Sequence, residues 1–290
     1  MEIDVSAEEV TLKVIVENSV KLGLKNILGA HGFSALVEVV DEKGVECRVL
    51  FDTGPNYSVL RNNCEVMGID MNKIDAIVLS HGHYDHTGGL LELLNKLSRK
   101  VPVICHPDCF KPKFVSKPKI RYNGIPFALR DLENKAWIIL SRDPLKIADS
   151  IITSGEIPRK TAFEKINRNM LTIVNGKLIN DQLLDDQSLI INFKRGAIII
   201  TGCAHAGIVN TILRAQELLA SSKIEAVIGG FHLISASNSR ISETIEYFKN
   251  LNIKSIMPCH CTGEKAIHEM YLKMKDKVRT VHAGDVIKFA

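Results

Sequence analysis

The chain has 290 residues, of which 46% are hydrophobic and 24% are charged, and its formal net charge is +4. This composition is typical of an ordinary soluble globular protein, and no run reaches the ~18 apolar residues of a membrane helix. The acidic start lacks the basic-then-apolar order of a signal peptide, so we expect a cytoplasmic protein that does not enter a membrane. Seven cysteines, an odd number, favour free thiols or metal ligands over a disulfide framework in that compartment.

The N-terminal part of the chain alternates short apolar strands with helical sequence. Apolar patterning predicts strands over residues 10–17, 35–40, 45–51, 75–79 and 101–104. The spacing of apolar residues predicts helices over 56–67 and 90–97. Strand, helix and strand in this order form the crossover unit of a layered α/β fold.

A basic, proline-containing stretch follows, at about residues 107–125, and it has no clear period. Because proline excludes a regular helix, we expect a surface loop or lid there. One interpretation is a solvated linker. The other is a basic flap that closes over a phosphate, with Lys117 and Lys119 as substrate contacts. Farther along, the turn-rich segment 154–159 contributes Arg159 as a third candidate to hold an anion.

The C-terminal part resumes the alternation without a repeat or a low-complexity tract. The length is long for one domain without excluding one, and we expect a single domain over residues 1–290. Its predicted strands cover residues 137–140, 151–153, 189–193, 197–201, 224–228, 253–257 and 286–289. Its predicted helices cover residues 208–219, 241–251 and 263–275.

One motif dominates the chain, the segment Ser80 to Leu90, which directly follows the predicted strand 75–79. Within six positions it holds His81, His83, Asp85 and His86. Imidazole nitrogen and carboxylate oxygen suit zinc, with manganese and iron as alternatives. The H-x-H-x-D-H spacing therefore predicts two divalent metal ions that activate a water between them, and a histidine-rich surface loop is the alternative.

Three later strands also end in residues that can bind metal. His205, His232 and His260 each follow an apolar strand, and Cys203 can bind directly as a thiolate. Because ligands gather at the carboxyl ends of strands in open α/β sheets, we expect these side chains to converge. His232 either binds metal or contacts substrate. Cys259 and Cys261 flank His260, and strand alternation predicts that both point away from it and serve in packing.

Asp52 ends the predicted strand 45–51 and is followed by Thr53-Gly54. A carboxylate at a strand terminus can orient a ligand histidine through a hydrogen bond. The alternative is an aspartate that only forms a turn.

These motifs resemble the metallo-β-lactamase superfamily: Ser-His-x-His-x-Asp-His-Thr-Gly-Gly after a strand, with Phe-Asp-Thr-Gly before it and strand-end histidines after it. The resemblance implies a four-layer αββα sandwich of two similar halves, with the metals at one edge. Segments 30–36, 201–207, 229–232 and 259–263 are similar to one branch, whose namesake activity is a dihydropterin-ribofuranosylaminobenzene phosphate synthase of methanopterin biosynthesis. That activity joins a pterin diphosphate to an arylamine and releases pyrophosphate.

Carried over by position, the resemblance makes His81, His83, Asp85, His86, His205 and His260 the metal ligands. Many superfamily members have a bridging aspartate where this chain has Cys203, which leaves the bridging ligand open.

The leading hypothesis is a two-metal enzyme acting on a phosphorylated or otherwise anionic small molecule, with Asp85, His31 and His232 as candidate catalytic or substrate-contacting residues. A first alternative is hydrolysis of an ester, lactone or thioester. A second is a metal-binding or regulatory protein without catalysis. We expect no nucleic-acid partner, because the basic residues are few and mostly in one loop. The oligomeric state stays open, a homo-oligomer included.

Overall fold

The structure is a computed structural model that describes residues 3 and 5–290. Within this range, thirteen strands form one mixed sheet in the order β16-β15-β14-β13-β1-β2-β3-β4-β5-β8, with β9, β10 and β17 paired beside this path. Their bounds are β1 Ala7–Val16, β2 Ser34–Asp41, β3 Glu46–Phe51, β4 Ala76–Val78, β5 Pro102–Cys105, β8 Trp137–Leu140, β9 Lys146–Ala148, β10 Ile151–Thr153, β13 Ser188–Phe193, β14 Gly196–Thr201, β15 Ile224–Gly230, β16 Ser255–Cys259 and β17 Val286–Phe289.

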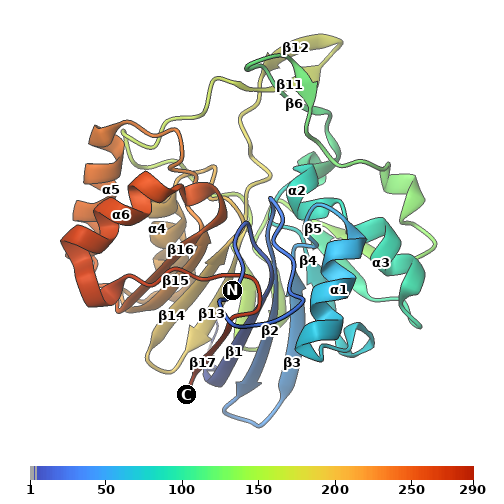
Figure 1. The fold of residues 1–290 in the computed structure, drawn as a ribbon, viewed down its shortest axis with the longest axis horizontal. Coiled ribbons are helices and arrows are strands. Elements are labelled where there is room, and N and C mark those ends of the chain that lie inside the picture. The colour runs from blue at the N-terminus through green and yellow to red at the C-terminus, as the bar shows by residue number, and fades with distance from the viewer. Residues whose placement is uncertain (1–2, 4) are drawn as a thin grey trace.

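The helices lie on the two outer sides of the strands, α1 to α3 on one side and α4 to α6 on the other (Figure 1). Their bounds are α1 Tyr57–Met67, α2 Tyr84–Thr87, α3 Leu90–Lys96, α4 Ile208–Leu219, α5 Asn238–Asn250 and α6 Glu264–Met274. Short 3₁₀ turns cover Met71–Lys73, Pro107–Phe110, Leu129–Asp131, His260–Thr262 and Lys275–Lys277.

Three apolar layers separate the four layers of secondary structure. Side chains of a strand alternate between its two faces, so one strand can supply two layers. In β14, Ile198 and Ile200 pack against residues of both halves of the sheet, whereas Ile199 packs under α4, α5 and α6. In β3, Phe51 joins the central layer, whereas Leu50 packs under α1 and α3. The predicted four-layer αββα sandwich is confirmed.

Parallel strands bring the predicted metal-binding segments to one edge. β3, β4, β5 and β8 are mutually parallel, and so are β14, β15 and β16. Of these, β4, β14 and β15 are almost wholly buried, which explains their runs of Ile and Val, whereas β8 is largely exposed. Asp52 follows β3, and the histidine segment follows β4. Cys203, His232 and His260 follow the ends of β14, β15 and β16.

The expected irregular loop at 107–125 is partly regular. Two strands from it, β6 Lys113–Val115 and β7 Arg121–Tyr122, join β11 Met170–Val174 and β12 Lys177–Asn180 in a four-stranded sheet, which we call the flap sheet. It stands apart from the large sheet, above α2 (Figure 1). Its strands are two to five residues long, and β6 pairs with β11 across a long stretch of chain, so local periodicity did not reveal them.

The described residues form no helix long and apolar enough to cross a membrane.

Candidate metal centre

The histidine segment leaves β4 as extended backbone and turns into α2 at His83, the residue that precedes the first helical turn. Gly82 lies between the first two histidines, where a Cβ atom would lie 2.1 Å from the carbonyl oxygen of Cys109. Only glycine therefore lets the segment pack this closely. The single turn of α2 then places Asp85 and His86 on adjacent positions, so the two side chains point in different directions.

Three histidines form the first group of candidate ligands. His81 Nε2 lies 2.9 Å from His83 Nδ1, which lies 3.2 Å from His205 Nε2. All three are buried. Burial, reinforced by neighbouring imidazoles, lowers the pKa of His81 and of His205 well below the ordinary value. Burial and Lys113 lower the pKa of His83 to about 3. These imidazoles are neutral near pH 7, as metal ligands must be.

Asp85, His86 and His260 form the second group. Asp85 Oδ2 lies 3.7 Å from His86 Nε2 and 3.5 Å from His260 Nε2, and the two nitrogens are 3.2 Å apart. Ligand atoms ~2.1 Å from a tetrahedral zinc ion lie roughly 3.4 Å from one another. The spacing within both groups is therefore that of ligands that share one ion.

The far side of each ring in the second group is held by an oxygen acceptor. His86 Nδ1 lies 2.7 Å from Asp52 Oδ2, and His260 Nδ1 lies 2.9 Å from Asn18 Oδ1. Each Nδ1 thus carries a proton, and in a neutral ring Nε2 turns a lone pair toward the other histidine and Asp85. Burial alone would lower the pKa of His86, but the carboxylates of Asp52 and Asp85 raise it to about 9. The space between these side chains therefore attracts positive charge, and their nitrogen and oxygen atoms fit a divalent ion.

Asp52 lies where the sequence analysis expects an orienting carboxylate. It is fully buried, and besides His86 it accepts hydrogen bonds from Ser80, through the backbone N–H and the hydroxyl, both at 2.7 Å. Gly202 passes beside this pair, where a Cβ atom would come within 2.1 Å of Ser80 Oγ and 2.8 Å of Asp52 Oδ2. The glycine before Cys203 is required by this close approach.

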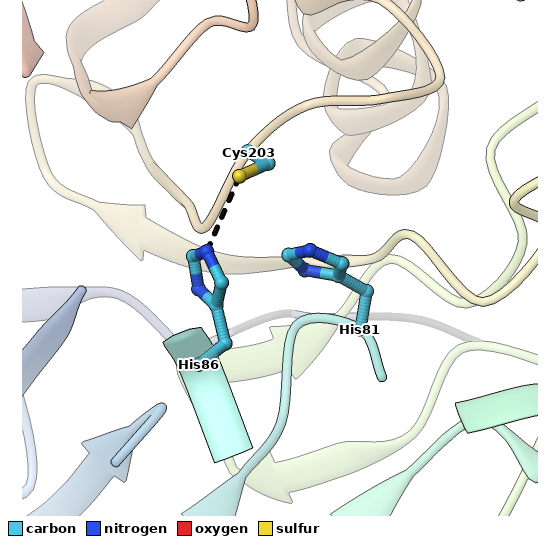
Figure 2. A group of neighbouring side chains, drawn as sticks. All are labelled: His81, His86 and Cys203. Carbon is cyan, nitrogen blue, oxygen red and sulfur yellow. Dashed lines mark hydrogen bonds between the residues drawn. The ribbon is translucent and has the colours of Figure 1, made fainter. Parts of the chain in front are cut away.

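Cys203 lies between the two groups. Its Sγ points at His86 Nε2 from 3.2 Å, with His81 beside them (Figure 2). The candidate ligand atoms of His81, His86 and Cys203 lie within 4.8 Å of one another. Burial raises the pKa of the Cys203 thiol well above its ordinary value in the absence of a metal. The sulfur is placed to contact ions held by either group.

Cys261 differs from the expectation that it points away from the site. It lines the same pocket as the candidate ligands, and its thiol donates to the Cys203 carbonyl oxygen at 3.6 Å. The reason is the backbone of His260, whose φ of 50° ends the strand alternation on which the expectation depended. Cys259, one residue before this turn, is packed in the central core layer as expected.

His31 and His232 both line the pocket. His31 Nε2 lies 3.3 Å from Asp85 Oδ2, and its side chain is 60% exposed. The ring of His232 lies 4.1 Å from that of His205. Neither of its nitrogens has a hydrogen-bond partner among the described residues, although both are buried. Its φ of 46° is costly for a residue other than glycine, and such strain clusters at functional sites.

The predicted anion-holding residues are placed differently from the expectation. The pocket over the candidate ligands has a volume of about 160 Å³, and its described lining includes Arg121 but neither Lys117 nor Lys119. Both lysines are exposed in the link between β6 and β7. Arg159 donates to the backbone carbonyl oxygens of His205 and Gln182, so its guanidinium holds the chain rather than facing the pocket. Arg121 was missed because only the pairing of β7 with β6 brings it to the pocket.

Asn18 and Asp185 were also missed. Asn18 follows β1, and its contact with His260 joins residues far apart in the sequence. Asp185 Oδ2 accepts the backbone N–H of Gly82 at 2.8 Å and so supports the histidine segment. The only local signal was the polar run Asp185-Asp186-Gln187 directly before a strand.

Comparisons with known proteins agree with this geometry. The profile described as Beta-lactamase superfamily domain matches residues 47–121. A 7,8-dihydropterin-6-methyl-4-(beta-D-ribofuranosyl)-aminobenzene-5'-phosphate synthase of Methanocaldococcus jannaschii is 38% identical and covers 89% of this chain and 90% of its own. An uncharacterised protein of the same archaeon is 36% identical, with 89% and 93% covered. The crystal structure of a metal-dependent hydrolase of the beta-lactamase superfamily superposes with a TM-score of 0.80, at 28% identity, covering 96% of this chain and 98% of that one.

The similarity to the synthase extends over most of both chains, and the hydrolase has the same fold over nearly its whole length. Both findings agree with the clusters of His, Cys and Asp side chains at the sheet edge. The chain therefore belongs to the metallo-β-lactamase superfamily, as a metal-dependent enzyme.

Proposed function

We propose that this enzyme transfers an organic group from a phosphorylated small molecule, with pterin transfer and pyrophosphate release as the leading reaction. The observation that carries the proposal is the meeting of two ligand groups at one small pocket that also contains Arg121. Two adjacent cations beside a guanidinium suit a diphosphate, whose oxygens carry several negative charges. The similarity to the synthase of Methanocaldococcus jannaschii supports the pterin as the group transferred.

Two divalent ions, zinc first and manganese or iron as alternatives, would supply Lewis-acid charge to the phosphoryl oxygens and the leaving group. His81, His83 and His205 would hold one ion through neutral nitrogens. Asp85, His86 and His260 would hold the other, with Cys203 within reach of both. Asp52 and Asn18 would keep the rings of His86 and His260 turned toward the pocket.

The remaining pocket residues would orient the substrate. Arg121, in the edge strand β7 of the flap sheet, would contact the anion in the pocket. His31, exposed at the rim beside Asp85, would contact substrate on entry. His232 has two buried nitrogens without a partner among the described residues, so either a substrate atom or an ion would satisfy one of them.

Hydrolysis of an ester, lactone or thioester is the second candidate function. It is favoured by the likeness to a metal-dependent hydrolase at a TM-score of 0.80. The uncharacterised relative is nearly as similar as the synthase, at 36% against 38%, so identity alone does not select the pterin reaction. The same side chains would serve either chemistry.

The two functions separate in one assay. The metal-loaded enzyme is mixed with 6-hydroxymethyl-7,8-dihydropterin diphosphate, with and without a ribofuranosylaminobenzene phosphate, and pyrophosphate is measured. We expect pyrophosphate only when the arylamine is present, together with the coupled pterin product. Turnover of nitrophenyl esters, lactones or thioesters without pyrophosphate from the pterin substrate would instead establish the hydrolase.

A further inference from the structure

A second and much larger cavity adjoins the metal pocket. It has a volume of about 980 Å³ and lies between α6, the segment 278–282 and the turn at 17–19 after β1. His260 and Ile234 line both this cavity and the pocket of about 160 Å³ over the candidate ligands. Ile234 is 66% exposed, and the two spaces adjoin at this residue and at His260.

The two spaces differ in what they can hold. Small-molecule sites in proteins have volumes of roughly 300–1,000 Å³. The metal pocket is below that range, so it accommodates a small charged group such as a diphosphate, whereas the cavity accommodates a fused ring system. A substrate with a charged end and a large organic body would therefore occupy both.

The charges of the two spaces differ as well. The cavity contains two acidic side chains, Glu17 and Glu264, and two basic ones, Lys265 and Arg279, so its formal charge balances. Its wall is mostly apolar and includes Ile267 and Tyr271 of α6. Tyr271 is 59% exposed, which leaves its ring free to stack on a flat ligand. Such a lining favours an uncharged aromatic body over an anion.

The wall shared with the metal centre is held by hydrogen bonds to His260. Glu17 is buried, and its Oε1 accepts the backbone N–H of His260 at 2.7 Å. Asn18 contacts the His260 ring at 2.9 Å, and both residues also line the cavity. A ligand seated there would lie against the groups that orient a candidate metal ligand, which fixes its position relative to the ions.

We propose that this cavity binds the uncharged ring system of the substrate, a fused nitrogen heterocycle of the pterin class, while its diphosphate lies in the metal pocket. The inference rests on the proposed function and assigns the binding site for the organic part of the substrate. The second substrate, a phosphorylated arylamine, is itself an anion. The charge-balanced cavity therefore suits the uncharged pterin ring better than it suits the arylamine.

The test is a fluorescence titration of the full-length protein with 6-hydroxymethylpterin, which lacks the diphosphate. Tyr271→Ala should weaken binding by about tenfold through the loss of a stacking face. Tyr247→Ala is the matched control, because Tyr247 is a partly exposed tyrosine on α5 outside the cavity lining. Asp85→Ala should leave the affinity for this probe unchanged, because its change is confined to the metal pocket.

Any of these results would overturn the inference: no saturable binding by the unaltered protein, equal affinity in the Tyr271→Ala variant, loss of binding only in the Asp85→Ala variant, or preference for 4-aminobenzoate over the pterin at this site. A change of oligomeric mass in Tyr271→Ala without a change in pterin affinity would also overturn the inference. It would mark the surface around Tyr271 as an interface between copies of this chain. Pyrophosphate release is scored separately. Pterin binding without pyrophosphate release would refute the proposed function and leave the cavity assignment standing.

Discussion

Lys113 of the flap sheet is ion-paired with Asp185, at 2.8 Å, and the other carboxylate oxygen of Asp185 accepts the N–H of Gly82 in the histidine segment. Lys113 is 1% exposed and also contacts Asp181 at 3.0 Å. The flap sheet is thus joined to the metal centre through a buried ion pair, and the position of Arg121 over the pocket depends on the same sheet.

Lys113→Met should therefore destabilise the protein by about 3–5 kcal/mol, because two buried carboxylates lose their counter-charge. The measurement is urea unfolding. Lys111→Met is the matched control: its ion pair with Asp108 is partly exposed, so the loss should stay under about 1 kcal/mol. Equal losses in the two variants would contradict a structural role for the buried pair.

The penalty of Lys113→Met should depend on pH. Burial alone would raise the pKa of Asp185, but Lys113 outweighs burial and lowers it. An acid with a lowered folded pKa contributes stability above its unfolded pKa, about 4 for aspartate, and that contribution is lost as the pH falls further. The difference between the unaltered protein and the variant should be largest near pH 7 and shrink below about pH 4. A difference that is constant across this range would rule out the ion pair as its origin.

Asp85→Ala should lower kcat/KM by at least about 10³-fold while leaving the fold intact, because it removes the carboxylate of the second ligand group. Metal analysis should show less than the two bound ions expected of the unaltered protein, and circular dichroism should be unchanged. Asp276→Ala, at an exposed position outside the pocket, is the control. An unaltered rate in Asp85→Ala would end the two-metal proposal.

Removal of metal with a chelator should abolish activity. Adding single metals back to the metal-free protein should then identify the metal that the enzyme uses. The imidazole-rich ligand groups favour zinc, so zinc should restore more activity than manganese or iron. Calcium should restore none, because it prefers sites made of oxygen atoms. Greater recovery with manganese or iron would assign the site to that metal instead.

Cys203 should bind metal as a thiolate. In protein loaded with cobalt, a sulfur ligand gives a charge-transfer absorption band in the near ultraviolet. Cys203→Ser should lose that band, since its Sγ lies 3.2 Å from His86 Nε2, between the two ligand groups. Cys261→Ser is the informative comparison, because the Cys261 thiol also lines the pocket. If that variant alone lost the band, Cys261 would be the sulfur ligand.

Arg121→Ala should raise KM for a phosphorylated substrate by about tenfold or more, the scale of one charge-assisted contact of about 1.5–3 kcal/mol. Lys117→Ala and Lys119→Ala should each change KM by less than about twofold, because neither lysine lines the pocket, whereas Arg121 does. A large effect at either lysine with none at Arg121 would mean that the flap sheet closes differently over substrate.

The sequence alone was sufficient to predict most strands of the large sheet, the helices that flank it and the residue types that gather at the candidate metal centre. Continuous apolar runs such as 197–201 and the H-x-H-x-D-H segment are local patterns, and the structure has a strand or a ligand cluster at each. The strand-end rule also selected His205 and His260 before any contact was known, because parallel strands share their carboxyl edge.

Only the tertiary structure decided which neighbours complete the site. Arg121 lines the pocket and Lys117 and Lys119 do not, because β7 pairs with β6, which in turn pairs with β11. Cys261 turns inward because His260 adopts a positive φ. Lys113 is buried because Asp181 and Asp185 reach it from about 70 residues away. Patterns of neighbouring residues encode which face of a strand is apolar. Contacts between distant segments depend on the tertiary fold of the whole chain, so no local pattern predicts them.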